Sequence, residues 1–175
     1  MENLNDLVRK ACKGNKDAFG QIYKIYFQKI YRYCRINLRN EAEAQDLAQE
    51  TFLKAWRSLA TFSTYNGSSV QAFLFKIAKN AIIDLSRKKR ELPLNTALEV
   101  ESGDNFEEDL DRKNDVETVQ KALSKLQEDE KQMVILRFFE EMSHRDIAEV
   151  LNSNEGTIRV KLHRILKKLK GIIHE

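Results

Sequence analysis

Residues 143–170 constrain the fold most strongly, because they read as two helices joined by a tight polar turn. Ser143 suits an N-cap, and Asp146 follows three residues later, which is close to the capping-box pattern. Asn152 opens the polar interruption, and Asn tolerates the left-handed backbone that such a turn uses. The segment therefore predicts a pair of helices near the C-terminus.

The second helix of this pair, from about Asn154, has two contrasting faces. At about 100° per residue, one face gathers four apolar residues: Ile158, Leu162, Ile165 and Leu169. The opposite face is mostly basic: Val160, His163, Arg164 and Lys167. A short helix packed behind a longer one with a basic outer face is the helix-turn-helix arrangement, whose second helix enters the DNA major groove. Gly156 predicts a close approach of the first helix. The alternative is an ordinary helical hairpin with a solvated Lys/Arg face.

The composition favours an all-α fold, because the 175 residues include one Pro and six Gly. No stretch approaches the ~20 apolar residues that span a membrane, and no N-terminal apolar run suggests a signal peptide. Cys12 and Cys34 have neither CxxC nor Cys/His metal spacing, so they fit thiols in a reducing cytoplasm. We expect no metal site, no cofactor and no membrane insertion.

Charge divides the chain into three blocks. Residues 1–90 hold 17 Lys/Arg against 8 Asp/Glu (net +9), residues 91–115 hold 2 against 9 (net −7), and residues 116–175 hold 11 against 10 (net +1). We therefore expect a four-helix domain at 1–90 and a four-helix domain at 116–175, joined by a flexible acidic linker at 91–115. Basic blocks suit a phosphate backbone.

Four helices are predicted in the first domain. They cover about 4–13, 17–38, 41–59 and 70–90, with Gly14 ending the first and Asp17 capping the second. Asn40 starts the third, and the fourth starts at Ser69 or Val70. In the second domain, helices at about 116–126 and 128–140 precede the helix-turn-helix.

The third helix has an unusual second face. Its core face gathers small and apolar residues: Leu47, Ala48, Thr51, Phe52, Ala55 and Leu59. Its other face mixes acids, an amide and two large apolar side chains: Asp46, Gln49, Glu50, Leu53 and Trp56. Either Leu53 and Trp56 pack under a neighbouring helix, or the face docks a partner protein, since Trp is favoured at interface anchors.

The fourth helix combines a core stripe, which includes Ile77 and Leu85, with a polar face. The polar face and the preceding loop at 60–69 supply cations, an amide and aromatic rings: Phe62, Tyr65, Lys76, Lys79, Asn80 and Arg87. Cations hold phosphates, an amide reads base edges, and aromatic rings stack on unpaired bases. These are the parts needed to grip an opened strand, although cations at a helix C-terminus also suit the helix dipole.

Three segments resemble bacterial sigma-70-family factors of the extracytoplasmic-function subfamily. DLAQETFLKAW (46–56) resembles the surface that docks on core RNA polymerase, AFLFKIAKNAIIDLSRKKR (72–90) the helix that reads the −10 element, and GTIRVKLHRILKKL (156–169) the helix that reads the −35 element. The resemblance covers nearly the whole chain outside the linker.

The resemblance implies a cytoplasmic protein that is not an enzyme, with core polymerase, promoter DNA and an anti-sigma factor as partners. Core polymerase would be bound by Asp46, Gln49, Glu50, Leu53 and Trp56. The melted −10 strand would be held by Phe62, Tyr65, Lys76, Lys79, Asn80 and Arg87. The −35 duplex would be read by Thr157, Arg159, Val160, His163, Arg164 and Lys167. The acidic linker would either thread the RNA exit path of the polymerase or act as a plain tether.

Some positions depart from the family pattern. Phe73 stands where Trp is common, and Glu141 stands where Gly usually ends a helix, so a left-handed Glu there would cost about 1 kcal/mol. Val160 stands where many relatives have Ser, and a Val methyl can contact thymine without forming a hydrogen bond. We therefore expect a different −35 preference.

Two other functions compete with the sigma factor. A stand-alone helix-turn-helix regulator would explain residues 116–175 but leaves 46–56 without a purpose. A DNA-acting nuclease would need a metal-ligand cluster or a nucleophile–base pair, and His144, His163 and His174 fit no ligand spacing.

Overall fold

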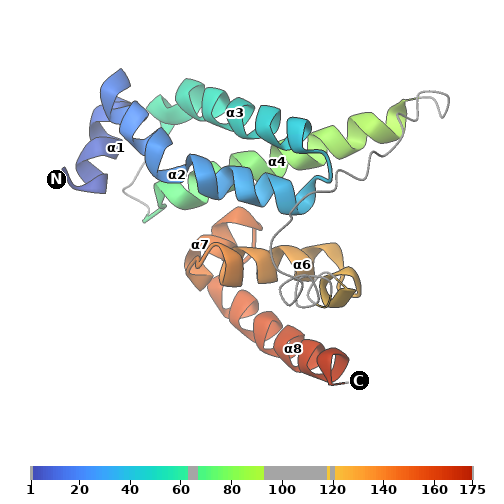
Figure 1. The fold of residues 1–175 in the computed structure, drawn as a ribbon. Coiled ribbons are helices and arrows are strands. Elements are labelled where there is room, and N and C mark those ends of the chain that lie inside the picture. The colour runs from blue at the N-terminus through green and yellow to red at the C-terminus, as the bar shows by residue number, and fades with distance from the viewer. Residues whose placement is uncertain (1, 63–66, 93–117, 119–120, 175) are drawn as a thin grey trace, which may run out of the picture. The chain divides into compact units, whose positions relative to one another are not determined.

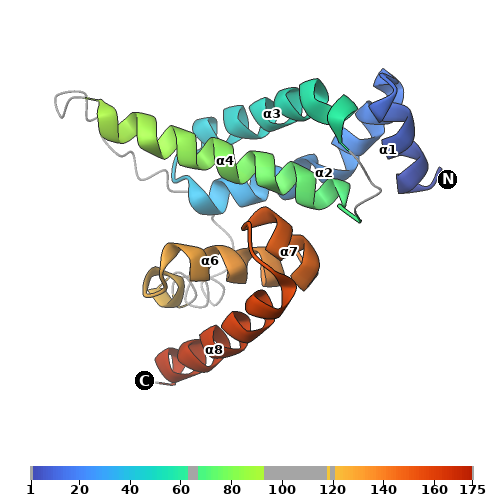
Figure 2. The same cartoon turned by 180° about the vertical axis from the view of Figure 1, so that it is seen from behind.

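The computed structural model describes residues 2–62, 67–92, 118 and 121–174, and these residues form helices and the loops between them (Figures 1 and 2). The chain divides into two units, Met1–Gly103 and Asp104–Glu175. The prediction of an all-α fold with two helical modules is confirmed. The predicted linker lies almost wholly outside the described residues, so its boundaries stay a prediction.

The described residues of the N-terminal unit form four α-helices and a short 3-10 turn. They are α1 (Leu4–Cys12), α2 (Lys16–Asn37), α3 (Glu41–Ser58), η1 (Leu59–Thr61) and α4 (Val70–Glu91). Gly14 has a φ of 90°, a backbone that suits glycine, and it follows the end of α1 as predicted.

Short polar side chains begin these helices. Asn40 and Ser69 accept hydrogen bonds from first-turn backbone N–H groups, so α3 and α4 begin where predicted and both residues act as caps. The predicted cap Asp17 is wrong, because Asn15 Oδ1 accepts the Ala18 N–H at 2.9 Å. Asp17 instead lies in the first turn, where a carboxylate suits the positive end of the helix dipole.

The core of the N-terminal unit is centred on α2, which contacts α1, α3 and α4 (Figure 1). Tyr33 of α2 and Phe75 of α4 are both fully buried, and their rings meet edge to face with centroids 5.3 Å apart. Edge-to-face pairs add about 0.5–1.5 kcal/mol beyond the burial of area. This contact fixes α4 against α2.

The buried face of α3 follows the prediction from helical spacing more closely than the buried face of α4 does. All six residues predicted for the core face of α3 are buried. On α4, Ile77 and Leu85 are only half-buried, whereas Ala72 and Phe75 are fully buried. Because α4 packs on both α2 and α3, its buried arc is wider than a single stripe and is displaced away from Ile77.

The C-terminal unit combines three short elements with one long helix. They are α6 (Glu128–Val134), a π-helical segment η3 (Ile135–Phe139), α7 (His144–Val150) and α8 (Glu155–Ile173). Thr118 and residues 121–124 are also helical, and most of the remaining predicted helix at 116–126 lies outside the described residues. The Gln127 N–H donates to Glu130 Oε2 at 3.1 Å and so helps to begin α6.

The predicted helix-turn-helix corresponds to α7, its turn and α8. The Asp146 N–H donates to Ser143 Oγ at 3.1 Å, which confirms the predicted cap of α7. The Thr157 N–H donates to Asn154 Oδ1 at 2.8 Å, so α8 begins where predicted. Asn152 has a φ of 51° and turns the chain between them, as predicted. The expected close approach at Gly156 is wrong, because a Cβ there would meet only Asn154 Oδ1, at 3.6 Å.

Two chemical expectations can be compared with the described residues. None of their helices is both long and apolar enough to cross a membrane. Within the same ranges, no group of three or more His, Cys, Asp or Glu side chains is placed to hold a metal ion. Burial raises the pKa of the Cys34 thiol to about 12, which keeps it protonated and unreactive.

Candidate protein and nucleic-acid interfaces

The mixed face of α3 is a surface in the folded unit. Asp46, Gln49 and Glu50 are exposed, and Leu53 is 59% exposed. The acids and the amide beside Leu53 on this helix do not shield it from water. The two alternatives left open by the sequence therefore apply to different residues. Leu53 projects outward, as a docking face requires, whereas Trp56 is half-buried.

Trp56 is held by a side chain from α2. Its ring lies against Phe19, with centroids 5.0 Å apart, and Phe19 also meets Phe52 at 6.4 Å. A rigid, half-covered tryptophan loses little side-chain freedom on binding, which suits an interface anchor.

A groove of about 400 Å³ runs between α2 and α3 beside Trp56. It is lined by residues of both helices: Lys16, Phe19, Tyr23, Gln49, Phe52, Leu53 and Trp56. The three- and four-residue spacing of apolar side chains along α2 does not by itself show that Phe19 and Tyr23 lie at the open edge of the core.

The groove is continued along α2 by a row of aromatic rings. Tyr23 stacks on Phe27 at 4.9 Å, Phe27 stacks on Tyr31 at 6.3 Å, and all three rings are half-buried. The Tyr31 hydroxyl donates to Glu41 Oε1 at 3.4 Å. Burial, and next the Glu41 carboxylate, raise the pKa of Tyr31. The row therefore gives the α2 side of the groove a stiff wall.

The charges beside the groove are arranged along α3. Asp46 lies in its N-terminal half and Glu50 lies near its middle, where Glu50 Oε1 is paired with Lys54 Nζ at 2.7 Å. Both partners are substantially exposed, so the pair contributes at most about 1 kcal/mol to stability. The Glu50 carboxylate can exchange this weak pairing for a cation on a partner.

The predicted strand-binding residues lie on and before α4. Phe62 is half-buried and packs on Phe73 with centroids 4.8 Å apart, while Tyr65 lies outside the described residues. Asn80 and Arg87 are exposed, and Lys76 and Lys79 are half-buried. Their helical spacing brings these four to one side of α4. Ile83, which is 45% exposed, also lies there.

The basic end of α4 has a structural part as well. Lys89 Nζ binds Glu43 Oε2 at 2.7 Å and thereby ties α4 to the first turn of α3. Arg87, Lys88 and Arg90 are exposed beside it. The sequence did not show that Lys89 differs in role from its neighbours Arg87, Lys88 and Arg90, because its partner Glu43 is 46 residues away.

The predicted duplex-reading residues share the outer side of α8. Val160 is 51% exposed, and His163, Arg164 and Lys167 are exposed, while Thr157 is half-buried in the first turn. Arg159 is exposed, but its Nη2 pairs with Glu155 Oε1 at 3.0 Å. The opposite face packs inward through Ile158, Leu162 and Ile165, and Leu169 is half-buried.

A second ion pair holds α8 in place. Lys168 Nζ binds Glu130 Oε2 at 3.2 Å and joins α8 to the start of α6. The Gln127 backbone N–H, and then Lys168, lower the pKa of Glu130, although partial burial opposes this. Lys168 thus stabilises the fold of the C-terminal unit, whereas the other cations named above lie on the outer side of α8.

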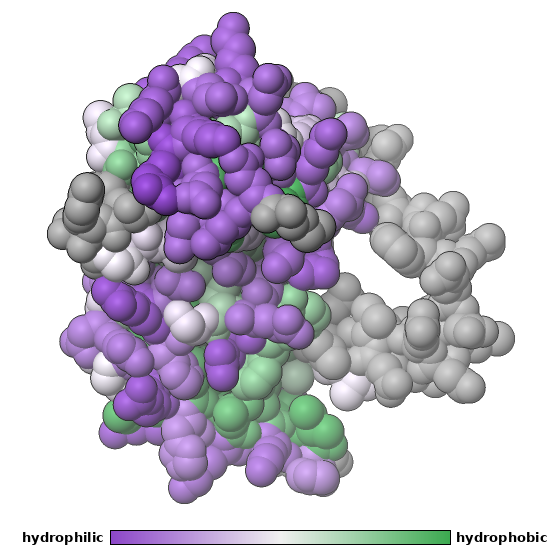
Figure 3. Space-filling model, turned by 90° about the vertical axis from the view of Figure 1, so that its left-hand side faces the viewer, coloured by the Kyte–Doolittle hydropathy of each residue, from purple (hydrophilic) through white to green (hydrophobic). Residues whose placement is uncertain are grey.

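The C-terminal unit also exposes apolar side chains away from this row. Phe138 and Phe139 of η3 are 51% and 38% exposed. Figure 3 shows apolar side chains gathered on the surface of this unit, in the lower part of the view. Sequence periodicity did not predict the exposure, because the π-helical turn rotates these rings relative to an α-helix.

Comparison with known families matches both units. The family model of sigma-70 region 2 matches residues 22–91, and that of sigma-70 region 4 matches residues 117–169. The first match contains the α3 surface and the basic side of α4. The second contains α7 and most of α8.

Three curated proteins are similar over most of the chain. The ECF RNA polymerase sigma factor BldN of Streptomyces coelicolor is 32% identical over 97% of this chain, which spans 66% of the length of BldN. The RNA polymerase sigma factor YlaC of Bacillus subtilis is 32% identical, with 89% of this chain and 92% of YlaC covered. The ECF RNA polymerase sigma factor SigW of the same organism is 31% identical, with 90% and 89% covered.

Solved structures share the fold. The sigma factor RpoE in complex with the anti-sigma factor NepR from Bartonella quintana is 26% identical, with a TM-score of 0.71 over 91% of this chain and 98% of that one. CnrH in complex with the cytosolic domain of CnrY has a TM-score of 0.72 at 24% identity, over 96% and 95% of the two chains.

Proposed function

We propose how this chain acts from one premise: it belongs to the sigma-70 family of RNA polymerase sigma factors, in the extracytoplasmic-function (ECF) group. The chain is a sigma factor, and it directs core RNA polymerase to promoters. We assign core binding and −10 recognition to the N-terminal unit, and −35 recognition to the C-terminal unit. We place this activity in the cytoplasm and assign no catalytic role to the chain.

One observation carries the assignment of core binding. The α3 surface combines an exposed Leu53, a half-covered Trp56 and exposed acids beside an apolar groove. Such a surface fits a partner helix that inserts an apolar side chain and presents cations toward Asp46 and Glu50. A regulator that only bound duplex DNA would have no use for it.

The basic side of α4 supports a role on the opened −10 strand. Lys76, Lys79 and Arg87 supply positive charge for phosphates, and Asn80 lies exposed between them for contact with a base edge. Phe62, already packed on Phe73, offers a ring near the start of the helix.

The outer side of α8 supports a role on the −35 duplex. It is the second helix of a helix-turn-helix, and its second and third turns present Arg159, Val160 and His163 in sequence. Residues in the N-terminal part of such a helix contact base edges, and more distant cations contact phosphates. Arg164 and Lys167 are placed for these later contacts.

An anti-sigma factor is a third partner in this proposal. The solved relative of 26% identity was crystallised with an anti-sigma factor. The exposed Leu53 and Trp56 on one unit, and Phe138 and Phe139 on the other, are apolar surfaces that such a protein could cover.

Binding of the chain to core polymerase tests the proposal directly. Replacing Trp56→Ala should weaken binding about 30-fold, because a buried anchor is worth about 2 kcal/mol. Glu50→Ala should have a smaller effect that shrinks with added salt. Gln28→Ala, which changes an exposed residue of α2 on the side away from the groove, is the control.

The alternative of a stand-alone regulator makes the opposite prediction. It requires that the wild-type chain bind duplex DNA specifically and show no measurable affinity for core polymerase. Equal polymerase binding by the Trp56→Ala and Gln28→Ala variants would also exclude the α3 surface as the docking site.

A further inference from the structure

Helix α8 carries a single acid, and that acid is paired with a residue assigned above to the −35 duplex. Between Glu155 and Ile173 the helix has six Lys or Arg residues and one carboxylate, that of Glu155. Glu155 Oε1 accepts a hydrogen bond from Arg159 Nη2 at 3.0 Å. The function proposed above gives Glu155 no part in DNA recognition.

Helical spacing places Glu155 on the outer side of α8 that is assigned to DNA. Residues four apart are neighbours on a helix surface, so Glu155, Arg159 and His163 form one row, and Lys167 continues it. All four residues are exposed. Near a bound duplex, a carboxylate in this row meets phosphates of like charge, so it lowers the affinity for DNA of any sequence.

The pair contributes little to the stability of the helix. The side chains of Arg159 and Glu155 are 63% and 49% exposed, and exposed pairs at this spacing are weak. Its effect on the arginine is larger, because a free arginine side chain has many rotamers and binding must select one of them. A carboxylate that already holds the guanidinium removes part of this cost before DNA arrives.

The pairing leaves most of the Arg159 guanidinium available to DNA. A guanidinium has five N–H donors in one plane, and within the described ranges its one acceptor is Glu155. Arginine reads guanine through two parallel hydrogen bonds, to O6 and N7. These bonds require one orientation of the planar group, and a contact with a fixed carboxylate in the first turn of the helix selects an orientation.

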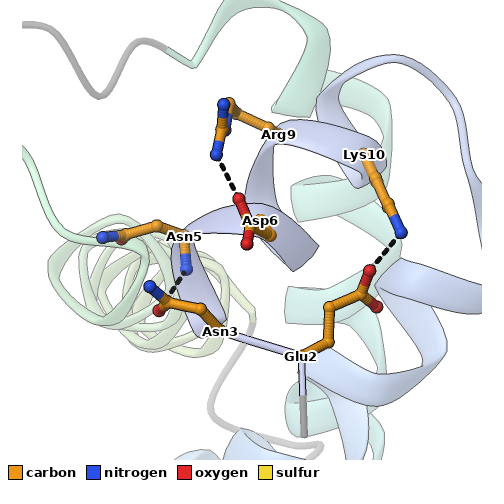
Figure 4. A network of polar contacts seen from close by, with 6 residues as sticks. All are labelled: Glu2, Asn3, Asn5, Asp6, Arg9 and Lys10. Carbon is orange, nitrogen blue, oxygen red and sulfur yellow. Dashed lines mark hydrogen bonds and ion pairs between the residues drawn. The ribbon is translucent and has the colours of Figure 1, made fainter.

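A similar pair on α1 shows what is particular to α8 (Figure 4). Asp6 also lies in the first turn of its helix, and it pairs with Arg9 while both side chains stay substantially exposed. The neighbouring cation on α1, Lys10, is paired with an acid as well. On α8, Arg164 and Lys167 pair with no acid of the described chain. The only acid of α8 therefore holds one arginine on a side that otherwise stays basic.

We propose that Glu155 is a positioning residue for −35 recognition, because its carboxylate holds the Arg159 guanidinium in the orientation that reads a guanine of the duplex. This role rests on the −35 function of α8 proposed above. Glu155 thereby raises the discrimination between bases at one position while it lowers the affinity for DNA in general. An ordinary surface pair would leave the discrimination unchanged.

Base preference across the −35 element tests this role. The full chain, assembled with core polymerase, selects among promoter duplexes randomised over the −35 and −10 regions, and sequencing of the bound fraction gives the preference at each position. Arg159→Ala identifies the position whose guanine preference depends on Arg159. We expect Glu155→Ala to reduce the preference at that same position about threefold, which is part of the discrimination that a bidentate arginine provides.

Three further variants separate the position of the arginine from the charge of the acid. Glu155→Gln keeps an acceptor oxygen, so it should retain more of the guanine preference than Glu155→Ala, while both bind random DNA more tightly than the wild type. In the Arg159→Ala background, Glu155→Ala should change no base preference, because the side chain that it positions is absent. Asp6→Ala breaks the similar pair on α1 and should leave every preference unchanged.

The outcomes distinguish this role from the −35 function itself. An unchanged guanine preference in Glu155→Ala would overturn the positioning role and leave recognition by Arg159 intact. A loss at a position that Arg159→Ala does not affect would also overturn it, because Glu155 would then contact a base directly, as carboxylates do with cytosine N4. If the wild-type chain showed no preference anywhere in the −35 region, the −35 function would fail.

Thermal unfolding separates positioning from a general effect on the fold. Glu155→Ala and Asp129→Ala each remove an exposed first-turn acid of the C-terminal unit, from α8 and α6 respectively. Both should lower Tm by similar small amounts, and only Glu155→Ala should change a base preference. If Asp129→Ala weakened the same guanine preference, helix stability rather than the position of Arg159 would set it, and the positioning role would be wrong.

Discussion

The functional surfaces of the two units expose different kinds of side chain. The N-terminal unit is built from long helices around a fully buried Tyr33–Phe75 contact, yet it leaves Leu53 59% exposed and Trp56 half-covered. The C-terminal unit combines the short helices α6 and α7 with the long helix α8, whose outer face is polar except for Val160. A surface that binds a protein needs apolar area from which binding displaces water, whereas a surface that binds duplex DNA needs charged and hydrogen-bonding groups.

The difference extends to how each unit is held together. Aromatic rings from α2 support the N-terminal surface, so its geometry depends on side-chain packing. In the C-terminal unit, the capping residues Ser143 and Asn154 and the left-handed Asn152 set the relation of α7 to α8. We therefore expect core changes to matter most in the first unit and local backbone changes to be informative in the second.

The largest effect is expected from Phe75→Ala. Removing this fully buried ring should destabilise the N-terminal unit by about 3–5 kcal/mol. Urea unfolding followed by circular dichroism should then show an early transition for the N-terminal unit and an unchanged one for the C-terminal unit. Phe73→Ala is the control, because Phe73 is half-buried. A single transition that shifts as a whole would show that the units do not unfold independently.

Arg164→Ala tests the polar face of α8. If Arg164 contacts −35 DNA, its loss should cost about 1–3 kcal/mol of binding to that element. Affinity for core polymerase should stay unchanged, which separates the C-terminal unit from the α3 surface. Electrophoretic mobility shifts and polymerase binding measured on the same variant provide the check. Equal loss in both assays would contradict the division of roles.

Asn80→Ala tests the basic side of α4 at the step of promoter opening. The lost base contact should reduce the open complex about tenfold, which corresponds to about 1.4 kcal/mol. Closed-complex binding should remain largely intact. Permanganate footprinting of the −10 region measures the bubble directly, and an unchanged bubble would remove Asn80 from the strand-binding site.

Glu141→Gly tests the backbone of the C-terminal unit. Glu141 has a φ of 54°, and a left-handed conformation costs a non-glycine residue about 1 kcal/mol. Glycine should relieve this strain and raise the free energy of unfolding by up to that amount. Thermal unfolding gives the measurement. Glu149→Gly, within the helical backbone of α7, should instead destabilise the unit.

The smallest effect is the pH dependence contributed by Glu130. Its pKa is lowered in the folded chain, so it stabilises the C-terminal unit above its unfolded pKa. This contribution is lost as the pH falls through the folded value. In Glu130→Gln, the acid side of the stability profile should be flatter than in the wild type. Identical profiles would show that the contact with Lys168 contributes nothing measurable.

Local patterns predicted much of this structure correctly. Asn40, Ser69, Ser143 and Asn154 begin helices as expected, because a short polar side chain satisfies first-turn N–H groups wherever the chain places it. Asp17 failed as a cap because Asn15, two residues earlier, makes the same bond. Such choices between neighbouring caps depend on backbone angles that a pattern does not contain.

The sequence by itself determined the helices, their apolar faces and the family-specific segments, because these depend on spacing within one helix. Only the tertiary structure decided which large side chains on those helices are covered. Phe19 reaches Trp56 from another helix, while no residue of the described chain covers Leu53 fully. Both outcomes depend on how α2 packs against α3.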